Sequence, residues 1–180
     1  RRQRQMCIRD SYQRVHPTLV KKKSYIASVE GVLNAVIIDG EPVGKNIVQG
    51  EGAGPAPTTS AIISDLSSIL RGNIKYPFNI SNKERRKIAT DSISNLSFSS
   101  YIRLEVRDIH GVLSNITKIF AKNKVSIKRL IQNPDKNKKN ASIILITHQS
   151  KDILLKNTLK QISNKKYVIK KPILIRIEND

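Results

Sequence analysis

The strongest constraint on the fold is a regular switching of hydrophobic periodicity between residues 101 and 180. Strands alternate apolar and polar side chains with a period of two, whereas an amphipathic helix repeats its apolar positions about every 3.6 residues. By this criterion the region predicts a strand, a helix, two strands, a helix and a strand, over residues 101–108, 111–122, 125–132, 141–147, 152–162 and 168–177. We therefore expect a βαββαβ order, with an antiparallel sheet carrying both helices on one face.

The two predicted helices each present one apolar face to this sheet. The face of the first comprises Val112, Ile116, Ile119 and Phe120, and that of the second comprises Leu155, Leu159 and Ile162. This is the ferredoxin-like arrangement.

The N-terminal half predicts a smaller antiparallel element that must lie on a larger sheet. Residues 29–38 and 43–49 read as two strands, and Asp39-Gly40 reads as the hairpin turn between them. A helix is expected over 61–70, since Ile62, Leu66 and Ile69 share one face. Its N-cap would come from Thr58, Thr59 or Ser60, and Gly72 would end it.

A glycine-rich loop at 50–54 leads into this helix. Glycine lets a ligand approach bare backbone, and a helix N-terminus favours negative charge, so the loop suits an anionic or dipolar ligand. The alternative is a tight turn before a helix with no ligand, because glycines at such a place are common.

Composition divides the chain into four parts. Residues 1–11 (RRQRQMCIRDS) show no periodicity, and we interpret them as a sequencing scar joined to a gene whose product extends further N-terminally; the alternative is a disordered basic arm. Residues 12–73 and 101–180 are the two structured regions. Residues 74–100 have the composition of a linker, with a possible short helix at 83–94.

The charge is strongly positive, with a formal net charge of +19. Residues 101–180 carry 18 Lys and Arg against 6 Asp and Glu, so most of the excess lies there. A nucleic-acid binder is one alternative, but the lysines are scattered and no RNA- or DNA-binding motif is present, so we expect no nucleic-acid partner. No run is long enough to span a membrane, and the single Cys7 excludes an internal disulfide; we expect a cytoplasmic protein.

Candidate catalytic and metal-binding groups are few. The three histidines, His16, His110 and His148, lack metal-ligand spacing, so no metal site is expected. No serine lies in a Gly-x-Ser-x-Gly motif and no carboxylate pair is marked out by an apolar setting. The sequence therefore predicts that the chain lacks a complete active site.

Three ordered motifs identify a family. The runs RVHPT (14–18), ASVEGVLNA (27–35) and GxGAGxxPTxSAxxxDL (50–66) together resemble the C-terminal part of the catalytic region of homoserine dehydrogenase. The runs DIHGVL (108–113) and VSI (125–127) resemble the ACT domain, a small regulatory module. The implied fold class is α/β (α+β), a partial antiparallel substrate-domain sheet with a returning helix, followed by a ferredoxin-like ACT domain.

The resemblance implies an NAD- or NADP-dependent oxidoreductase that interconverts L-aspartate 4-semialdehyde and L-homoserine, on the route to threonine, methionine and isoleucine. In this family the catalytic lysine and the dinucleotide fingerprint precede the segment present here. We therefore assign no catalytic residue, expect the chain alone to be inactive, and do not give that role to Lys21, Lys22 or Lys23. A homo-oligomer is expected.

The resemblance also implies two sets of binding residues. Cofactor contacts are expected from Gly54, with support from Gly52 and Thr58. An effector, expected to be threonine acting by feedback, would bind where the first strand of the ACT domain meets its first helix, at Asp108, Gly111, Val112, Leu113 and Asn115. The alternative is a stand-alone amino-acid-sensing or dimerising ACT module without catalysis.

Overall fold

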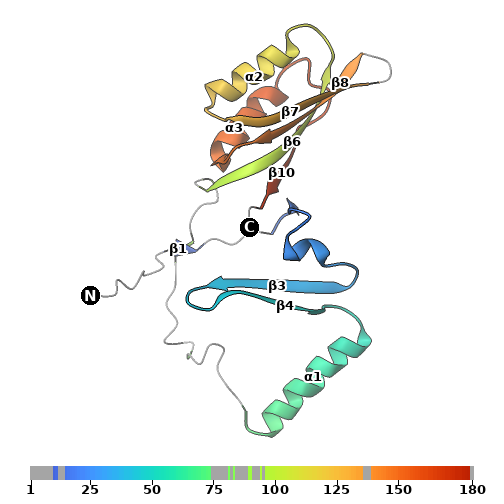
Figure 1. Ribbon diagram of the computed structural model, residues 1–180, viewed down its shortest axis with the longest axis vertical. Coiled ribbons are helices and arrows are strands. Elements are labelled where there is room, and N and C mark those ends of the chain that lie inside the picture. Colours follow the sequence, from blue (N-terminus) through green and yellow to red (C-terminus); the bar gives the residue numbers. More distant parts are fainter. Residues whose placement is uncertain are drawn as a thin grey trace, which may run out of the picture. The chain divides into compact units, whose positions relative to one another are not determined.

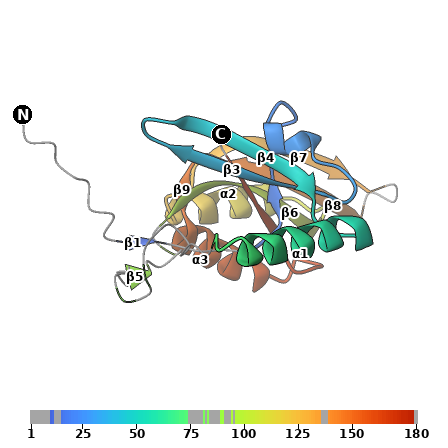
Figure 2. The same ribbon diagram turned by 90° about the horizontal axis from the view of Figure 1, so that it is seen from below.

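The computed structural model describes residues 10–11, 15–73, 81, 83, 89–90, 94, 96–135 and 139–178. The chain divides into two compact units, one of Arg1–Val20 with Ile88–Asp180 and one of Lys21–Lys87, and each is treated by itself below (Figures 1 and 2). Most of the segment 1–11 and of the possible helix 83–94 lies outside the described residues. In the first unit, β1 (Asp10–Ser11) pairs in parallel with β5 (Ala89–Thr90).

The main part of the first unit is a mixed sheet with two helices on one face (Figure 1). Its strand order is β2-β10-β6-β8-β7, and β9 pairs with β6. The elements in chain order are β2 (Thr18–Leu19), β6 (Ser97–Arg107), α2 (Val112–Lys122), β7 (Ile127–Pro134), β8 (Asn140–Thr147), β9 (Ser150–Lys151), α3 (Asp152–Ser163) and β10 (Ile173–Ile177). The predicted βαββαβ order is confirmed by β6, α2, β7, β8, α3 and β10.

The core of this unit lies between the sheet and the two helices. Alternate residues of β6 and β8 face the helices and are buried, which is the period-two burial expected of a half-covered sheet. The buried apolar side chains are Ile102, Leu104, Val106, Ala141, Ile143 and Leu145 from the strands, Val112, Ile116, Phe120, Leu155 and Ile162 from the helices, and Val125. Ile119 and Leu159, predicted on the same helix faces, are partly buried against this core.

Strand β6 begins inside the range predicted as a linker. Ser97 and Phe98 pair with Lys151 and Ser150 of β9, and the Ser100 N–H donates to Thr147 Oγ1 at 3.1 Å. A serine-rich sequence has low intrinsic strand preference, but neighbouring strands that satisfy its backbone groups override it.

Strand β2 adds a residue pair from far upstream to the edge of this sheet. Thr18 and Leu19 lie parallel to Arg176 and Ile177 of β10, and Thr18 Oγ1 donates to the Arg176 carbonyl oxygen at 3.0 Å. The Glu178 N–H donates to the Leu19 carbonyl oxygen at 2.9 Å. Residues grouped by sequence with 12–73 thus belong in part to the sheet of the first unit.

The second unit contains a 3-10 turn, η1 (Tyr25–Ser28), a hairpin of β3 (Leu33–Gly40) and β4 (Gly44–Glu51), and helix α1 (Pro55–Leu70). The hairpin is confirmed, but the turn predicted at Asp39-Gly40 is wrong. Asp39 pairs with Lys45 and Gly40 with Gly44, so the turn comprises residues 41–43. Pro42, which has no N–H to give to a ladder, lies in that turn, and Asp39 opposite Lys45 is a favourable cross-strand pair.

Helix α1 also begins earlier than predicted. Its N-cap is Gly54 and its first residue is Pro55, whose fixed φ suits the first helical position, so the predicted caps at Thr58, Thr59 and Ser60 are wrong. The predicted stop is confirmed: Gly72 has a φ of +74° and its N–H donates to the Ile69 carbonyl oxygen at 2.9 Å.

The second unit leaves its apolar side chains exposed. No residue of β3, β4 or α1 is buried, and five apolar residues of α1 are more than half exposed, namely Ile62, Ile63, Leu66, Ile69 and Leu70. Exposed apolar surface of this kind usually marks a place where a further surface or a ligand binds. In the described part of the chain, no helix has the length and apolar character needed to cross a membrane.

Candidate functional site

The glycine loop that precedes α1 is open on its surface. Residues 51–56 are exposed, Gly52 and Gly54 among them. Gly54 has φ +122° and ψ 157°, a region that residues with a side chain rarely adopt. A methyl group on Gly54 would meet only the Pro57 ring, at an ordinary contact distance of 3.5 Å. The need for glycine at this position therefore comes from the backbone conformation and not from crowding within the chain.

Gly52 is constrained in a different way. Its N–H donates to the Val32 carbonyl oxygen at 3.1 Å, which joins the end of the hairpin to the residue before β3. The Asn34 carboxamide occupies the space that a Cβ on Gly52 would need. Gly52 thus has a structural reason to be glycine, which the spacing of the motif alone does not reveal.

Thr58 closes the first turn of α1. Its N–H and its hydroxyl both donate to the Gly54 carbonyl oxygen, at 3.3 and 2.7 Å. Among the first three helical residues only Ala56 carries a backbone N–H, because Pro55 and Pro57 have none. This helix start consequently offers fewer donors to a phosphate group than most, while its exposed glycine backbone still permits close contact.

The predicted effector residues lie on the β6–α2 loop and the first turns of α2. Gly111 is the N-cap of α2 with a φ of +83°, and there is open space where its side chain would be. The Asp108 N–H donates to the Lys139 carbonyl oxygen at 2.9 Å, and its Oδ1 accepts from Gln132 Nε2 at 3.1 Å. A pocket of about 390 Å³ is lined by Asp108, Ile109 and His110.

The other members of the predicted set lie elsewhere. Val112 is buried in the core, so only its backbone faces the loop. Leu113 is exposed. Asn115 lines a different pocket, together with Tyr167. The five residues therefore do not line one cavity.

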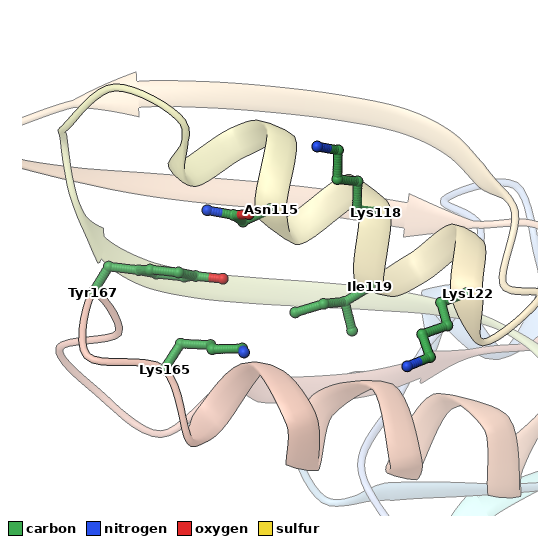
Figure 3. Close-up of a pocket in the computed structure, with 6 residues that line it drawn as sticks. All are labelled: Asn115, Lys118, Ile119, Lys122, Lys165 and Tyr167. Atoms are coloured by element: carbon green, nitrogen blue, oxygen red, sulfur yellow. The ribbon is translucent and has the colours of Figure 1, made fainter.

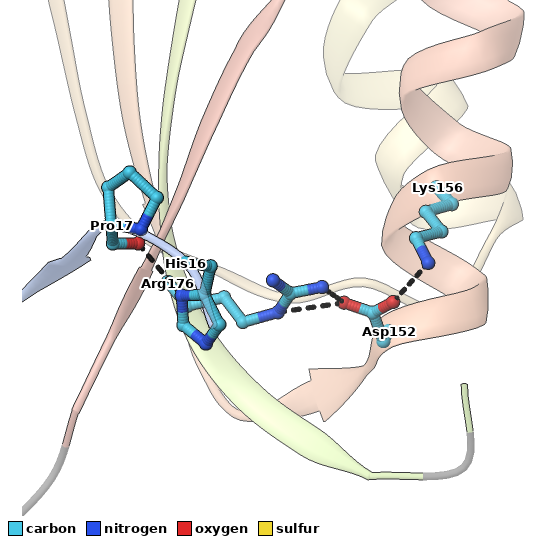
Figure 4. A network of polar contacts seen from close by, with 5 residues as sticks. All are labelled: His16, Pro17, Asp152, Lys156 and Arg176. Atoms are coloured by element: carbon cyan, nitrogen blue, oxygen red, sulfur yellow. Dashed lines mark hydrogen bonds and ion pairs between the residues drawn. The ribbon is translucent and has the colours of Figure 1, made fainter. Parts of the chain in front are cut away.

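A buried ion-pair network at Asp152 was not predicted from the sequence (Figure 4). The Asp152 carboxylate is fully buried at the start of α3 and accepts hydrogen bonds from the Arg176 guanidinium, with Nε at 3.0 Å from Oδ1. Lys156 Nζ lies 2.8 Å from Oδ2. Burial by itself would raise the pKa of Asp152, but the hydrogen bonds and positive charges of Lys156 and Arg176 hold that pKa below its usual value.

Arg176 connects this network to three strands. Its guanidinium carbon lies 5.4 Å from the centre of the Phe98 ring in β6, and its carbonyl oxygen accepts from Thr18 in β2. Next to β2, His16 Nδ1 and the Pro17 carbonyl oxygen are 2.8 Å apart (Figure 4). The network joins α3, β6, β10 and β2, and we assign it a structural role.

Comparisons with known proteins agree with this architecture. Residues 2–67 match the family model for homoserine dehydrogenase, and residues 100–165 match that for the ACT domain. The chain is 34% identical over 166 residues to a homoserine dehydrogenase of Helicobacter pylori, an alignment covering 92% of this chain and 39% of that protein. It is 30% identical over 172 residues to the homoserine dehydrogenase of Neisseria gonorrhoeae, covering 92% and 40%.

A crystal structure of a homoserine dehydrogenase from Thiobacillus denitrificans superposes with a TM-score of 0.78 at 30% identity, covering 91% of this chain and 38% of that one. The chain thus spans about two fifths of the length of the curated relatives it matches. The family match begins at residue 2, so it includes most of the segment interpreted above as a scar. The chain therefore contains a segment of the homoserine dehydrogenase family over residues 2–67, and an ACT domain over residues 100–165 follows it.

Proposed function

We propose that this chain supplies the C-terminal part of an NAD- or NADP-dependent homoserine dehydrogenase, which interconverts L-aspartate 4-semialdehyde and L-homoserine. The observation that carries the proposal is the exposed Gly54, held in a conformation that favours glycine at the start of α1, within the segment that matches the family. When bound, the nicotinamide cofactor supplies the hydride acceptor or donor. The chain's own contribution is a bare backbone surface against which a flat ring can pack.

The geometry of the loop favours contact with the nicotinamide end of the cofactor over contact with its phosphates. With prolines at positions 55 and 57, the helix start offers few N–H donors, and Thr58 uses its N–H within the turn. Gly54 is therefore the residue proposed to touch the cofactor, while Gly52 and Thr58 hold the loop in shape. The proton donor and the dinucleotide domain are expected from parts of the dehydrogenase that this chain does not contain.

The test is an assay of the whole dehydrogenase that contains this chain. We expect homoserine to drive the reduction of NAD or NADP in the full-length enzyme, and we expect the 180-residue chain alone to show no turnover. A folded full-length enzyme that binds the cofactor but leaves homoserine unoxidised would contradict the proposal.

We further propose that the β6–α2 loop of the ACT domain binds threonine as a feedback effector. The effector carboxylate would meet the backbone N–H groups at the start of α2, where Gly111 leaves open space. The Asp108 carboxylate, which borders the pocket, would accept from the effector ammonium group. Val112 would contribute through its backbone and Leu113 through its exposed side chain. Asn115 would need to reach over from its own pocket.

A homo-oligomer is part of the proposal, and the open edge of the ACT sheet supports it. The β10 edge is covered by β2, whereas β7 pairs with β8 alone among the described strands. An uncovered strand edge is suited to pair with the same strand of a second copy. The alternative function of the domain is dimerisation alone. In that case threonine will not bind.

Titration calorimetry of threonine into the chain separates these two roles. We expect saturable heat that is lost in Gly111→Val, because a branched side chain is strained at a φ of +83° and fills the open space. Asp108→Asn keeps the backbone and removes the charge, so binding is expected to weaken about tenfold or more.

The control is Asp39→Asn, an exposed aspartate in β3 outside the ACT domain, which should bind threonine as the unmodified chain does. If the unmodified chain gives no heat while light scattering shows it to be a dimer, the ACT domain serves dimerisation alone.

A further inference from the structure

A second pocket in the ACT domain lies between α2 and the turn that follows α3 (Figure 3). It has a volume of about 240 Å³ and is lined by Asn115, Lys118, Ile119, Lys122, Lys165 and Tyr167. Three of these six residues are lysines and none is acidic. The pocket shares no lining residue with the one at Asp108, Ile109 and His110.

Backbone and amide hydrogen bonds fix the walls of this pocket. The Arg107 N–H donates to the Tyr167 carbonyl oxygen at 2.8 Å, and the Lys165 N–H donates to the Ile162 carbonyl oxygen at 2.9 Å. The side-chain amides of Asn123 and Gln161 each donate to the other at 3.3 Å, which links the end of α2 to α3. The backbone that carries Lys165 and Tyr167, and the end of α2, are thus held in place before any ligand arrives.

The Tyr167 hydroxyl is an unused donor at this site. Its oxygen is buried and has no hydrogen-bond partner within the described part of the chain, although a buried hydroxyl nearly always has one. Figure 3 shows the hydroxyl directed from the turn toward α2, between the side chains of Asn115 and Lys165. Burial raises the pKa of Tyr167, so the group stays protonated and able to donate. The Asn115 and Lys165 side chains lie on either side of this hydroxyl in Figure 3.

The lysines leave positive charge uncompensated around this donor. Lys122 and Lys165 extend toward the pocket in Figure 3, while the ammonium group of Lys118 is turned away from Tyr167. Lys118 and Lys122 are four residues apart on α2, a like-charge spacing that disfavours the helix. Among the residues described, none of the three forms an ion pair with a carboxylate.

We propose that this pocket, which shares only Asn115 with the proposed threonine contacts, binds a small ligand through a phosphate group and takes no part in the dehydrogenase reaction. Tyr167 and Asn115 would donate hydrogen bonds, and Lys122 and Lys165 would neutralise the charge. A phosphate group carries about −1.5 to −2 charges near neutral pH and three strong acceptor oxygens, so it matches several cations and a hydroxyl donor better than a single carboxylate does.

The test is a titration of the isotope-labelled 180-residue chain with inorganic phosphate, followed by amide chemical shifts, with chloride at matched ionic strength as reference. We expect saturable shifts at residues 115–122 and 164–168 with phosphate and none with chloride. Glycerol phosphate in a parallel arm distinguishes the source: tighter binding of the ester assigns the pocket to a phosphate monoester, and equal binding assigns it to free phosphate. Shifts that spread over all surface lysines without saturating would overturn the proposal, as would the same shifts produced by threonine.

Three variants locate the interaction. Tyr167→Phe removes only the hydroxyl, so the fold is expected to persist while phosphate affinity falls about tenfold, the usual effect of losing a hydrogen bond to a charged group. Lys165→Gln should also weaken binding, and Lys128→Gln in β7, outside the pocket, should leave it unchanged. Equal phosphate affinity in Tyr167→Phe and Lys128→Gln would contradict the assignment.

Discussion

Replacing Asp152 with alanine is expected to destabilise the ACT domain by about 3–5 kcal/mol, the range found when one partner of a buried ion pair is removed. The carboxylate is fully buried and is held by Arg176 and Lys156, so its loss leaves the guanidinium, whose side chain is 17% exposed, without its counter-ion. Denaturant unfolding followed by circular dichroism measures the change. For a domain of this size the melting temperature should fall by more than about 10 °C.

The matched control is Lys156→Ala. The Lys156 side chain is 55% exposed, so its ion pair with Asp152 is screened by water and should contribute no more than about 1 kcal/mol. The double variant Asp152→Leu with Arg176→Leu is expected to lose less free energy of unfolding than the two single variants lose in sum. The reason is that the double variant leaves no unpaired charge at the Asp152–Arg176 pair. If Asp152→Ala lost no more stability than Lys156→Ala, the Arg176 guanidinium would have to be well hydrated without its partner.

The same network predicts how stability depends on pH. The pKa of Asp152 in the folded protein is held below its reference value of 3.8, so the unfolded state binds the proton more readily. The stabilisation is therefore fully present above that value and is lost as the pH falls through the lower folded pKa. Unfolding free energies measured between neutral pH and about pH 2 should decline in this acid range for the unmodified chain and decline less for Asp152→Asn.

The ACT fold could be predicted from the sequence because its patterns are local. The apolar positions of α2 recur at helical spacing and those of β8 alternate. The type of each element can therefore be predicted from its own residues alone. Val112, Ile116 and Phe120, all placed on one helix face by the sequence, are indeed buried in the core.

What the sequence did not predict depends on partners distant in the chain. Strand β2 exists because Thr18 and Leu19 meet Arg176 and Ile177, and a two-residue run carries no periodicity of its own. The periodicity predicts the start of α1 too late, because the apolar repeat begins at Ile62 whereas the helix begins at Pro55, and proline is well suited to the first helical position.

The candidate sites show the same division. The glycine loop and the β6–α2 loop were found through motifs confined to short stretches. Three other features arise from contacts between separate elements. They are the Asp152–Arg176 pair, the Asn34 side chain against Gly52, and the buried Tyr167 hydroxyl that has no hydrogen-bond partner in the described part of the chain. A single sequence contains no signal that links such residues, although an aspartate at the first residue of a helix is itself a common feature.

Replacing Gly54 in the full-length dehydrogenase is expected to lower kcat/KM for the cofactor, measured in homoserine oxidation. The expected decrease is about tenfold for Gly54→Ala and about a hundredfold for Gly54→Val. At a φ of +122°, any side chain imposes backbone strain of about 1–3 kcal/mol, and the branched chain also covers the surface proposed to meet the nicotinamide ring. Steady-state kinetics with the cofactor and with homoserine varied in turn would separate the two Michaelis constants.

The control for this pair is Gly40→Val. Gly40 lies in β3, its φ is outside the left-handed region, and nothing occupies the space where its side chain would be, so valine should fit the strand and leave activity unchanged. If Gly54 only shapes a turn, Gly54→Ala will lower the melting temperature while the Michaelis constant for the cofactor stays that of the unmodified enzyme. If the Gly54 backbone faces the cofactor, the Michaelis constant for the cofactor should rise while that for homoserine stays unchanged. The reason is that only the cofactor then meets the added methyl group.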